Sequence, residues 1–110
     1  MTAHALIAGG GIGGLAAALA CARALCDVHL YEQADAFSEV GAGVQLGPNA
    51  VRRLFCFGLG AALDAVAARP ARLSVCSAIS GRELAALPLN PDMAARHGAP
   101  YCTVHRADLH

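Results

Sequence analysis

The chain has 110 residues, of which 56% are hydrophobic and only 15% are charged, and its eight basic and eight acidic residues cancel. This balance, with no run of lysine or arginine, excludes nucleic acid as an expected partner. Globular domains usually carry about 25% charged residues, so the apolar excess predicts a piece of a larger protein whose other parts cover this surface. An alanine-rich composition inherited from a GC-rich genome is the alternative explanation.

The first thirty or so residues predict a strand, a helix and a second strand. Residues 5–8 are a short apolar run that is typical of a buried strand in a parallel sheet. Residues 13–25 show helical spacing of apolar side chains, and the near absence of charge predicts a helix buried on several sides. Residues 28–31 form the second strand, closed by Glu32. This length suits a right-handed βαβ unit.

The middle of the chain predicts a loop followed by two short helices. Residues 33–47 are rich in glycine and are expected to form the loop. The first helix begins at Pro48 and continues over residues 49–57, because proline suits the first helical turn. Residues 61–68 predict the second helix.

The last third predicts an antiparallel hairpin, a loop, a strand and the start of a helix. Residues 73–78 and 83–87 flank a short turn and form the hairpin. Residues 88–100 are expected to be a loop, with or without a helical turn, and 102–105 a short strand. Residues 106–110 are typical of a first helical turn, and a chain that stops there suggests truncation.

The turn after the first strand has the pattern Gly9-x-Gly11-x-x-Gly14. Gly9 permits the tight turn, Gly11 lets a pyrophosphate approach the backbone, and Gly14 lets the helix lie close to the sheet. The helix N-terminus then offers N–H groups and a partial positive charge to phosphates. A strand before the motif and a helix after it raise its specificity, so we predict a dinucleotide site.

Glu32 ends the second strand, eighteen positions after Gly14. Its carboxylate can accept hydrogen bonds from the adenosine ribose hydroxyls. A carboxylate repels a 2′-phosphate, so NADP is disfavoured in this site. FAD and NAD both remain, and the motif by itself does not separate them.

Other residue classes predict no additional chemistry. The five cysteines are odd in number and contain no CxxC, and the histidines do not join them at zinc-ligand spacing, so no metal is expected. Reduced thiols favour a cytoplasmic protein. The apolar stretch 5–22 is interrupted by five glycines, which argues against an integral membrane segment.

Two further motifs carry a family resemblance. Residues 41–50, Gly-Ala-Gly-Val-Gln-Leu-Gly-Pro-Asn-Ala, resemble the second signature of the class A flavoprotein monooxygenases, and residues 104–109, Val-His-Arg-Ala-Asp-Leu, resemble a third. The resemblance covers essentially the whole chain and is strongest to single-component aromatic hydroxylases. It implies an α/β fold, in which residues 1–110 are the N-terminal fragment of a Rossmann-like FAD-binding domain. The fold would be incomplete, with the remainder of the FAD and substrate domains absent.

The resemblance also implies roles for individual residues. Gly13 and the turn around it would meet the FAD pyrophosphate, while Glu32 would hold the ribose with Gln33 beside it. Gln45 would lie near the flavin ring or ribityl chain, and Arg106 would contact FAD from the next helix. An ordinary loop glutamine and a surface arginine are the alternatives for these last two residues. No residue is identified as catalytic.

The implied activity belongs to the full-length protein. By the resemblance, that protein would hydroxylate a small aromatic acid with O2, using FAD and either NADH or NADPH as reductant, and a homodimer is an allowed assembly. The fragment alone is expected to be inactive. Two alternatives stay open: an NAD-dependent oxidoreductase domain, and an inactive truncated remnant.

Overall fold

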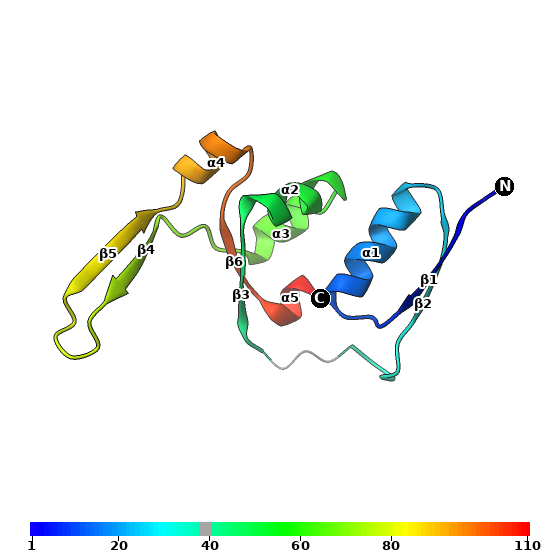
Figure 1. Ribbon diagram of the computed structural model, residues 1–110, viewed down its shortest axis with the longest axis horizontal. Helices are drawn as coiled ribbons and strands as arrows, with labels where there is room; N and C mark the ends of the chain where they lie inside the picture. The colour runs from blue at the N-terminus through cyan, green and yellow to red at the C-terminus, as the bar shows by residue number, and fades with distance from the viewer. Residues whose placement is uncertain (38–40) are drawn as a thin grey trace. The chain divides into compact units, whose positions relative to one another are not determined.

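The computed structural model describes residues 1–37 and 41–110 (Figure 1). The chain divides into two compact units. Unit 1 comprises Met1–Ala42 together with Arg106–His110, and unit 2 comprises Gly43–His105.

Unit 1 is built on the predicted strand, helix and strand. Strands β1 (His4–Ala8) and β2 (Asp27–Tyr31) pair in parallel, with Ile7 opposite Leu30. Helix α1 (Ile12–Arg23) connects them and packs against both. The βαβ prediction is therefore confirmed.

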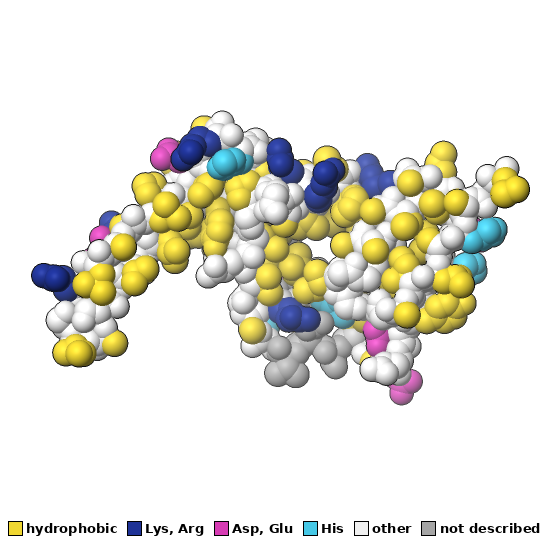
Figure 2. Space-filling view, viewed as in Figure 1, with side chains coloured by type: hydrophobic (Ala, Val, Ile, Leu, Met, Phe, Trp, Pro, Cys, Tyr) yellow, Lys and Arg dark blue, Asp and Glu magenta, His cyan; other side chains and the backbone are white. Residues whose placement is uncertain are grey.

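The expectation that α1 is buried on several sides is wrong for this chain. The helix has no buried residue, and Leu19 is 40% exposed. On the other face of the sheet, Leu6 and Tyr31 are exposed as well. The reason is that, among the described residues of unit 1, the sheet consists of β1 and β2, and these two strands cover one side of α1. Figure 2 shows hydrophobic side chains over this surface.

The C-terminus of α1 is closed by a Schellman motif centred on Leu25. Its N–H donates to the Ala22 carbonyl at 3.0 Å, and the Cys26 N–H donates to the Cys21 carbonyl at 3.0 Å. Leu25 has φ +61°, in the left-handed region where glycine is usual. The predicted helix over residues 13–25 therefore ends earlier, because this left-handed residue turns the chain away from the helix axis.

Replacing Leu25 with glycine is expected to stabilise the protein. A left-handed conformation costs an L-residue about 1–2 kcal/mol, and the greater freedom of glycine in the unfolded chain offsets part of the gain. We expect the free energy of unfolding to rise by about 0.5–1 kcal/mol in urea titrations. Ala24→Gly is the matched control, since Ala24 has φ −83° and should lose stability. Equal losses of stability in Leu25→Gly and Ala24→Gly would contradict the assignment of Leu25 as the left-handed residue of the Schellman motif.

Unit 2 contains a second two-stranded sheet with helices beside it. Strand β3 (Gly43–Leu46) pairs antiparallel with β6 (Cys102–His105). Helices α2 (Pro48–Cys56) and α3 (Gly60–Val66) follow β3, and the short helix α4 (Asp92–His97) packs against α2. Proline occupies the first turn of α2, as the sequence predicts.

Strand β3 corrects the expectation of a loop over residues 33–47; residues 38–40 of that loop lie outside the described residues. The pairing of β3 with β6 buries Leu46 and Val104 on one face. A four-residue strand next to glycines is too short to show a recognisable alternation of apolar and polar residues. Its partner strand lies more than fifty residues away, so the local sequence does not indicate the pairing either. Strand β6 and the hairpin agree with their predictions.

The buried core of the described residues lies in unit 2. It consists of Leu46, Val51, Leu63, Leu89, Ala99, Cys102 and Val104. A bridge between Ala68 and Thr103 ties the chain after α3 to the second edge of β6. Burial raises the pKa of the Cys102 thiol, since a low-dielectric environment disfavours the thiolate.

Strands β4 (Arg72–Cys76) and β5 (Glu83–Pro88) form the predicted antiparallel hairpin. Leu73 lies opposite Leu87, so these two leucines share one face, and both are about half exposed. An ion pair joins Arg72 to Glu83. The hairpin therefore presents an uncovered apolar face.

The last element is α5 (Arg106–Leu109), which belongs to unit 1. The Arg106 N–H donates to the Ala42 carbonyl at 2.9 Å. This confirms the helical turn predicted after β6 and returns residues 106–110 to the unit that carries the glycine-rich turn.

Candidate functional site

The glycine-rich turn joins β1 to α1 and has the backbone that the motif requires. Gly9 has φ +107°, and its N–H extends the parallel ladder by donating to the Tyr31 carbonyl at 2.7 Å. Gly11 precedes α1 in an extended conformation, and no side chain caps the helix. The N–H groups of the first turn have no partner within the helix, so they are suited to an anion.

The space around each glycine distinguishes their roles. A Cβ on Gly14 would lie 1.9 Å from the Gly9 carbonyl oxygen and 3.6 Å from Cγ2 of Ile7, so only glycine allows the helix this close to the strand end. A Cβ on Gly11 or Gly13 would meet nothing within 4 Å. The predicted close packing at Gly14 is therefore present, and the backbone at Gly11 and Gly13 is open to a ligand.

Glu32 is held against the turn by backbone N–H groups. Its Oε2 accepts from Gly10 N at 2.6 Å, and its Oε1 accepts from Ala34 N at 3.0 Å. A carboxylate offers about four lone-pair sites, so two remain for further donors. The side chain is thus positioned in advance at the end of β2, beside the opening of α1.

The same contacts change the acidity of Glu32. The N–H of Ala34, followed by that of Gly10, lowers the pKa of the carboxyl below its usual range, and desolvation opposes this shift only in part. These donors bond to the charged form and favour it. Glu32 is therefore a carboxylate at neutral pH.

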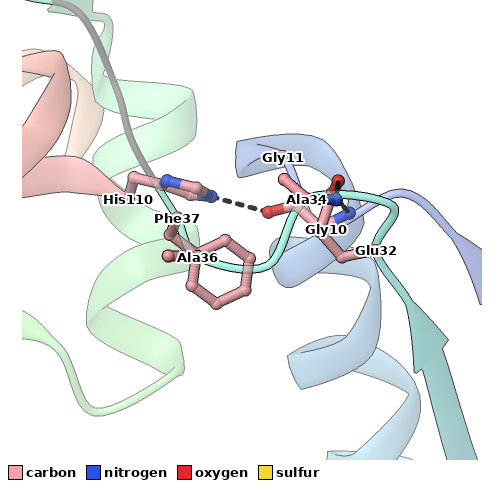
Figure 3. A pocket seen from close by; sticks show the side chains of 7 residues that line it. All are labelled: Gly10, Gly11, Glu32, Ala34, Ala36, Phe37 and His110. Carbon is pink, nitrogen blue, oxygen red and sulfur yellow. Dashed lines mark hydrogen bonds between the residues drawn. The ribbon is translucent and has the colours of Figure 1, made fainter.

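A small hollow opens beside this carboxylate, and all of its lining belongs to unit 1. Its volume is about 130 Å³, and Figure 3 shows the residues that line it: Gly10, Gly11, Glu32, Ala34, Ala36, Phe37 and His110. Pockets that enclose a whole drug-sized ligand measure about 300–1,000 Å³. The hollow therefore suits one part of a dinucleotide, with the remainder outside it.

His110 closes one side of the hollow. Its Nε2 donates to the Gly10 carbonyl at 2.6 Å, since a carbonyl oxygen only accepts (Figure 3). Its ring meets Phe37 edge to face, with 4.7 Å between centroids. The Gly10 peptide is therefore held at its N–H by Glu32 and at its carbonyl by His110.

The sequence motifs do not indicate Gly10, Phe37 or His110 as site residues. Gly10 sits inside the motif, and a Cβ there would lie 2.7 Å from the Phe37 ring. Phe37 and His110 are 73 positions apart, and no motif links them. Only the return of α5 to unit 1 could have indicated His110.

The structure brings most predicted site residues together in unit 1. Gly9, Gly11, Gly13 and Gly14 share the turn beside Glu32. Gln33 follows Glu32 and is exposed, but it does not line the hollow. Arg106 is exposed at the first position of α5, where its backbone N–H bonds to Ala42.

Gln45 lies in unit 2, on the exposed face of β3. Its Oε1 accepts a hydrogen bond from the Tyr101 hydroxyl at 2.7 Å. It is a strand residue rather than the loop residue that the sequence predicted.

The described residues hold no group of three or more His, Cys, Asp or Glu side chains arranged to bind a metal ion. All five cysteines are described, and none forms a disulfide. None of the described helices combines the length and hydropathy needed to cross a membrane.

Comparisons with known proteins connect this geometry to flavoenzymes. Residues 7–51, which contain the turn and Glu32, match the family described as an NAD(P)-binding Rossmann-like domain. The chain is 42% identical over 105 residues to 3-hydroxybenzoate 6-hydroxylase of Polaromonas naphthalenivorans, covering 96% of this chain and 26% of the relative. It is also 42% identical to 6-hydroxynicotinate 3-monooxygenase of Bordetella bronchiseptica, covering 94% and 27%.

A solved structure supports the same relationship. The FAD and uric acid complex of HpxO from Klebsiella pneumoniae superposes with a TM-score of 0.84 at 29% identity, covering 97% of this chain and 26% of that one. The chain thus spans about a quarter of the length of the relatives that it matches. The resemblance drawn from the motifs is confirmed.

Proposed function

Because the chain is related to the N-terminal quarter of FAD-dependent aromatic hydroxylases, we propose that it is the FAD-binding segment of a flavoprotein monooxygenase. The complete enzyme would hydroxylate a small aromatic acid with O2 and NADH or NADPH. The observation that carries the proposal is the Glu32 carboxylate, held by two backbone N–H groups beside an uncapped helix start.

The residues of unit 1 fit the ADP half of FAD. Open backbone at Gly11 and Gly13 leaves room for a diphosphate at the start of α1, where N–H groups and the helix dipole favour negative charge. The unused lone pairs of Glu32 can accept from two ribose hydroxyls. A 2′-phosphate would meet a carboxylate there, which favours FAD or NAD over NADP.

Three further residues belong to the proposal by resemblance. Gln33 would contact the adenosine side next to Glu32, Arg106 would pair with the negative charge of the cofactor, and Gln45 would act near the flavin. When bound, FAD supplies the redox chemistry, and the chain binds and orients it. Residues 1–110 are accordingly proposed as part of one FAD-binding domain, in a cytoplasmic enzyme.

A second candidate is an NAD-dependent oxidoreductase domain. The match of residues 7–51 to an NAD(P)-binding Rossmann-like domain favours it, since the turn and Glu32 also suit NAD. The structural relatives with bound FAD favour the first candidate.

The proposal is tested on the product of the whole gene, including any sequence after codon 110. We expect a yellow protein with flavin absorbance near ~450 nm, from which denaturation releases FAD. NADH or NADPH oxidation should then increase with an aromatic acid such as 3-hydroxybenzoate or 6-hydroxynicotinate. A colourless protein that binds NAD and not FAD would establish the second candidate instead.

A further inference from the structure

The sheet of β3 and β6 has one buried and one open face. Its register places Val44 opposite Val104 and Leu46 opposite Cys102, and three of these four side chains (Leu46, Cys102 and Val104) are buried. Since side chains alternate along a strand, the intervening residues lie on the other face. They are Gly43, Gln45, Thr103 and His105. This second face, which we call the polar face, carries amide, hydroxyl and imidazole groups beside a glycine.

Tyr101 orients the amide of Gln45 on the polar face. The Tyr101 hydroxyl donates to Gln45 Oε1 at 2.7 Å, across 56 positions of sequence. An amide group is planar, so engaging its oxygen from one side also determines the direction of its NH2 group. Among the described residues, none accepts a hydrogen bond from Gln45 Nε2.

Tyr101 is itself held in place by Asn90. The Asn90 side chain donates from Nδ2 to the Tyr101 carbonyl at 2.8 Å and accepts at Oδ1 from the Tyr101 N–H at 3.1 Å. The same Nδ2 donates to the Pro70 carbonyl at 2.9 Å. The Asn90 side-chain amide thus bonds to both the N–H and the carbonyl of Tyr101, as the backbone of a paired strand would. These bonds hold the backbone from which the tyrosine ring projects.

We infer that Tyr101 is a positioning residue that aims the Gln45 NH2 group at a ligand oxygen on the polar face. A single hydrogen bond between side chains at the surface contributes little to stability. A donor that is oriented before binding contributes to recognition, because the cost of ordering it is not charged to the binding step. The inference rests on the proposed function. The oxygen is either a carbonyl of the flavin ring or an oxygen of the aromatic acid, and both accept hydrogen bonds.

Two variants separate this role from a structural one. Gln45→Glu keeps an oxygen for the Tyr101 hydroxyl but removes the NH2 donor, so a structural role predicts no change. We expect it to weaken ligand binding at least tenfold, with an unchanged melting temperature of the cofactor-free protein. Tyr101→Phe should weaken binding about fivefold, equivalent to ~1 kcal/mol for one neutral hydrogen bond. Tyr31→Phe is the matched control, because it removes a hydroxyl from unit 1 with no expected effect.

The measurements use the product of the whole gene with two probes, FAD and then 3-hydroxybenzoate added to the FAD-loaded protein. Weaker FAD binding with altered visible flavin bands in both variants identifies a flavin oxygen. Unchanged FAD binding with weaker binding of the acid identifies a substrate oxygen. If both variants bind both probes like the wild type, the inference is overturned. A wild-type protein that binds no FAD overturns the proposed function itself, and the inference falls with it.

Discussion

Replacing Gly14 with alanine is expected to abolish FAD binding and to destabilise unit 1. The new Cβ would lie 1.9 Å from the Gly9 carbonyl oxygen, which is a backbone atom and cannot rotate away. The first turn of α1 must therefore move off the strand end, which displaces the N–H groups proposed to meet the diphosphate. Overpacking of this kind usually costs about 1–3 kcal/mol, and a backbone clash belongs at the upper end. Thermal melting and FAD titration measure the two effects.

Gly13→Ala is the matched control for this prediction. It adds the same methyl group one position earlier in α1, where nothing lies within 4 Å. Alanine is favoured over glycine inside a helix by about 0.5–1 kcal/mol, so the melting temperature should rise slightly. Gly13→Ala is a control for stability and not for FAD binding, since Gly13 is itself proposed to face the diphosphate. A Gly14→Ala protein as stable as the wild type would show that α1 does not pack against the turn in this way.

Replacing Glu32 with glutamine is expected to weaken FAD binding about ten- to a hundredfold, the range that follows from losing hydrogen bonds to a charged group. The glutamine oxygen can accept from only one of the two N–H groups that Glu32 now satisfies. Its NH2 group would face the other donor, and the charge that strengthens bonds to ribose hydroxyls is lost. Fluorescence titration of FAD gives the dissociation constants.

Glu83→Gln provides the control, because Glu83 pairs with Arg72 on the hairpin of unit 2 and is remote in sequence from the turn. It should bind FAD like the wild type. If Glu32→Gln does the same, the carboxylate does not hold the ribose.

Acidification should reproduce the loss of Glu32. The pKa of Glu32 is lowered in the folded protein. The stabilising contribution of its carboxylate is therefore complete above the unfolded-state pKa of a glutamate, about 4.3. The contribution disappears as the pH falls from there through the lower folded-state value. We expect FAD release below about pH 4 to be steeper in the wild type than in Glu32→Gln. Parallel pH profiles for the two proteins would contradict this role.

The turn was predictable because its physical requirements are local. A left-handed Gly9, a contact at Gly14 that excludes any side chain, and a carboxylate one strand later all follow from spacing within about thirty residues. Glu32 and Gly14 therefore have the surroundings that the sequence indicates. The ligand contacts of Gln33, Gln45 and Arg106 stay predictions.

The remainder of the site depends on contacts between distant segments. Phe37 and His110 meet because residues 106–110 return to unit 1 after the whole of unit 2. Similarly, β3 exists as a strand because β6 pairs with it, and Tyr101 reaches Gln45 through that pairing. Periodicity within a short window contains no information about such partners.

By itself, the sequence determined the βαβ unit, the glycine turn, the acidic residue after the second strand and the hairpin, because short-range sterics and hydrogen bonding dictate them. The tertiary structure decided which surfaces are covered and which side chains meet. It left α1 half exposed on a two-stranded sheet, placed Leu25 in a left-handed turn and closed the hollow beside Glu32 with His110. Burial and long-range pairing are properties of the assembled chain, so they follow from how many strands and which distant segments come together.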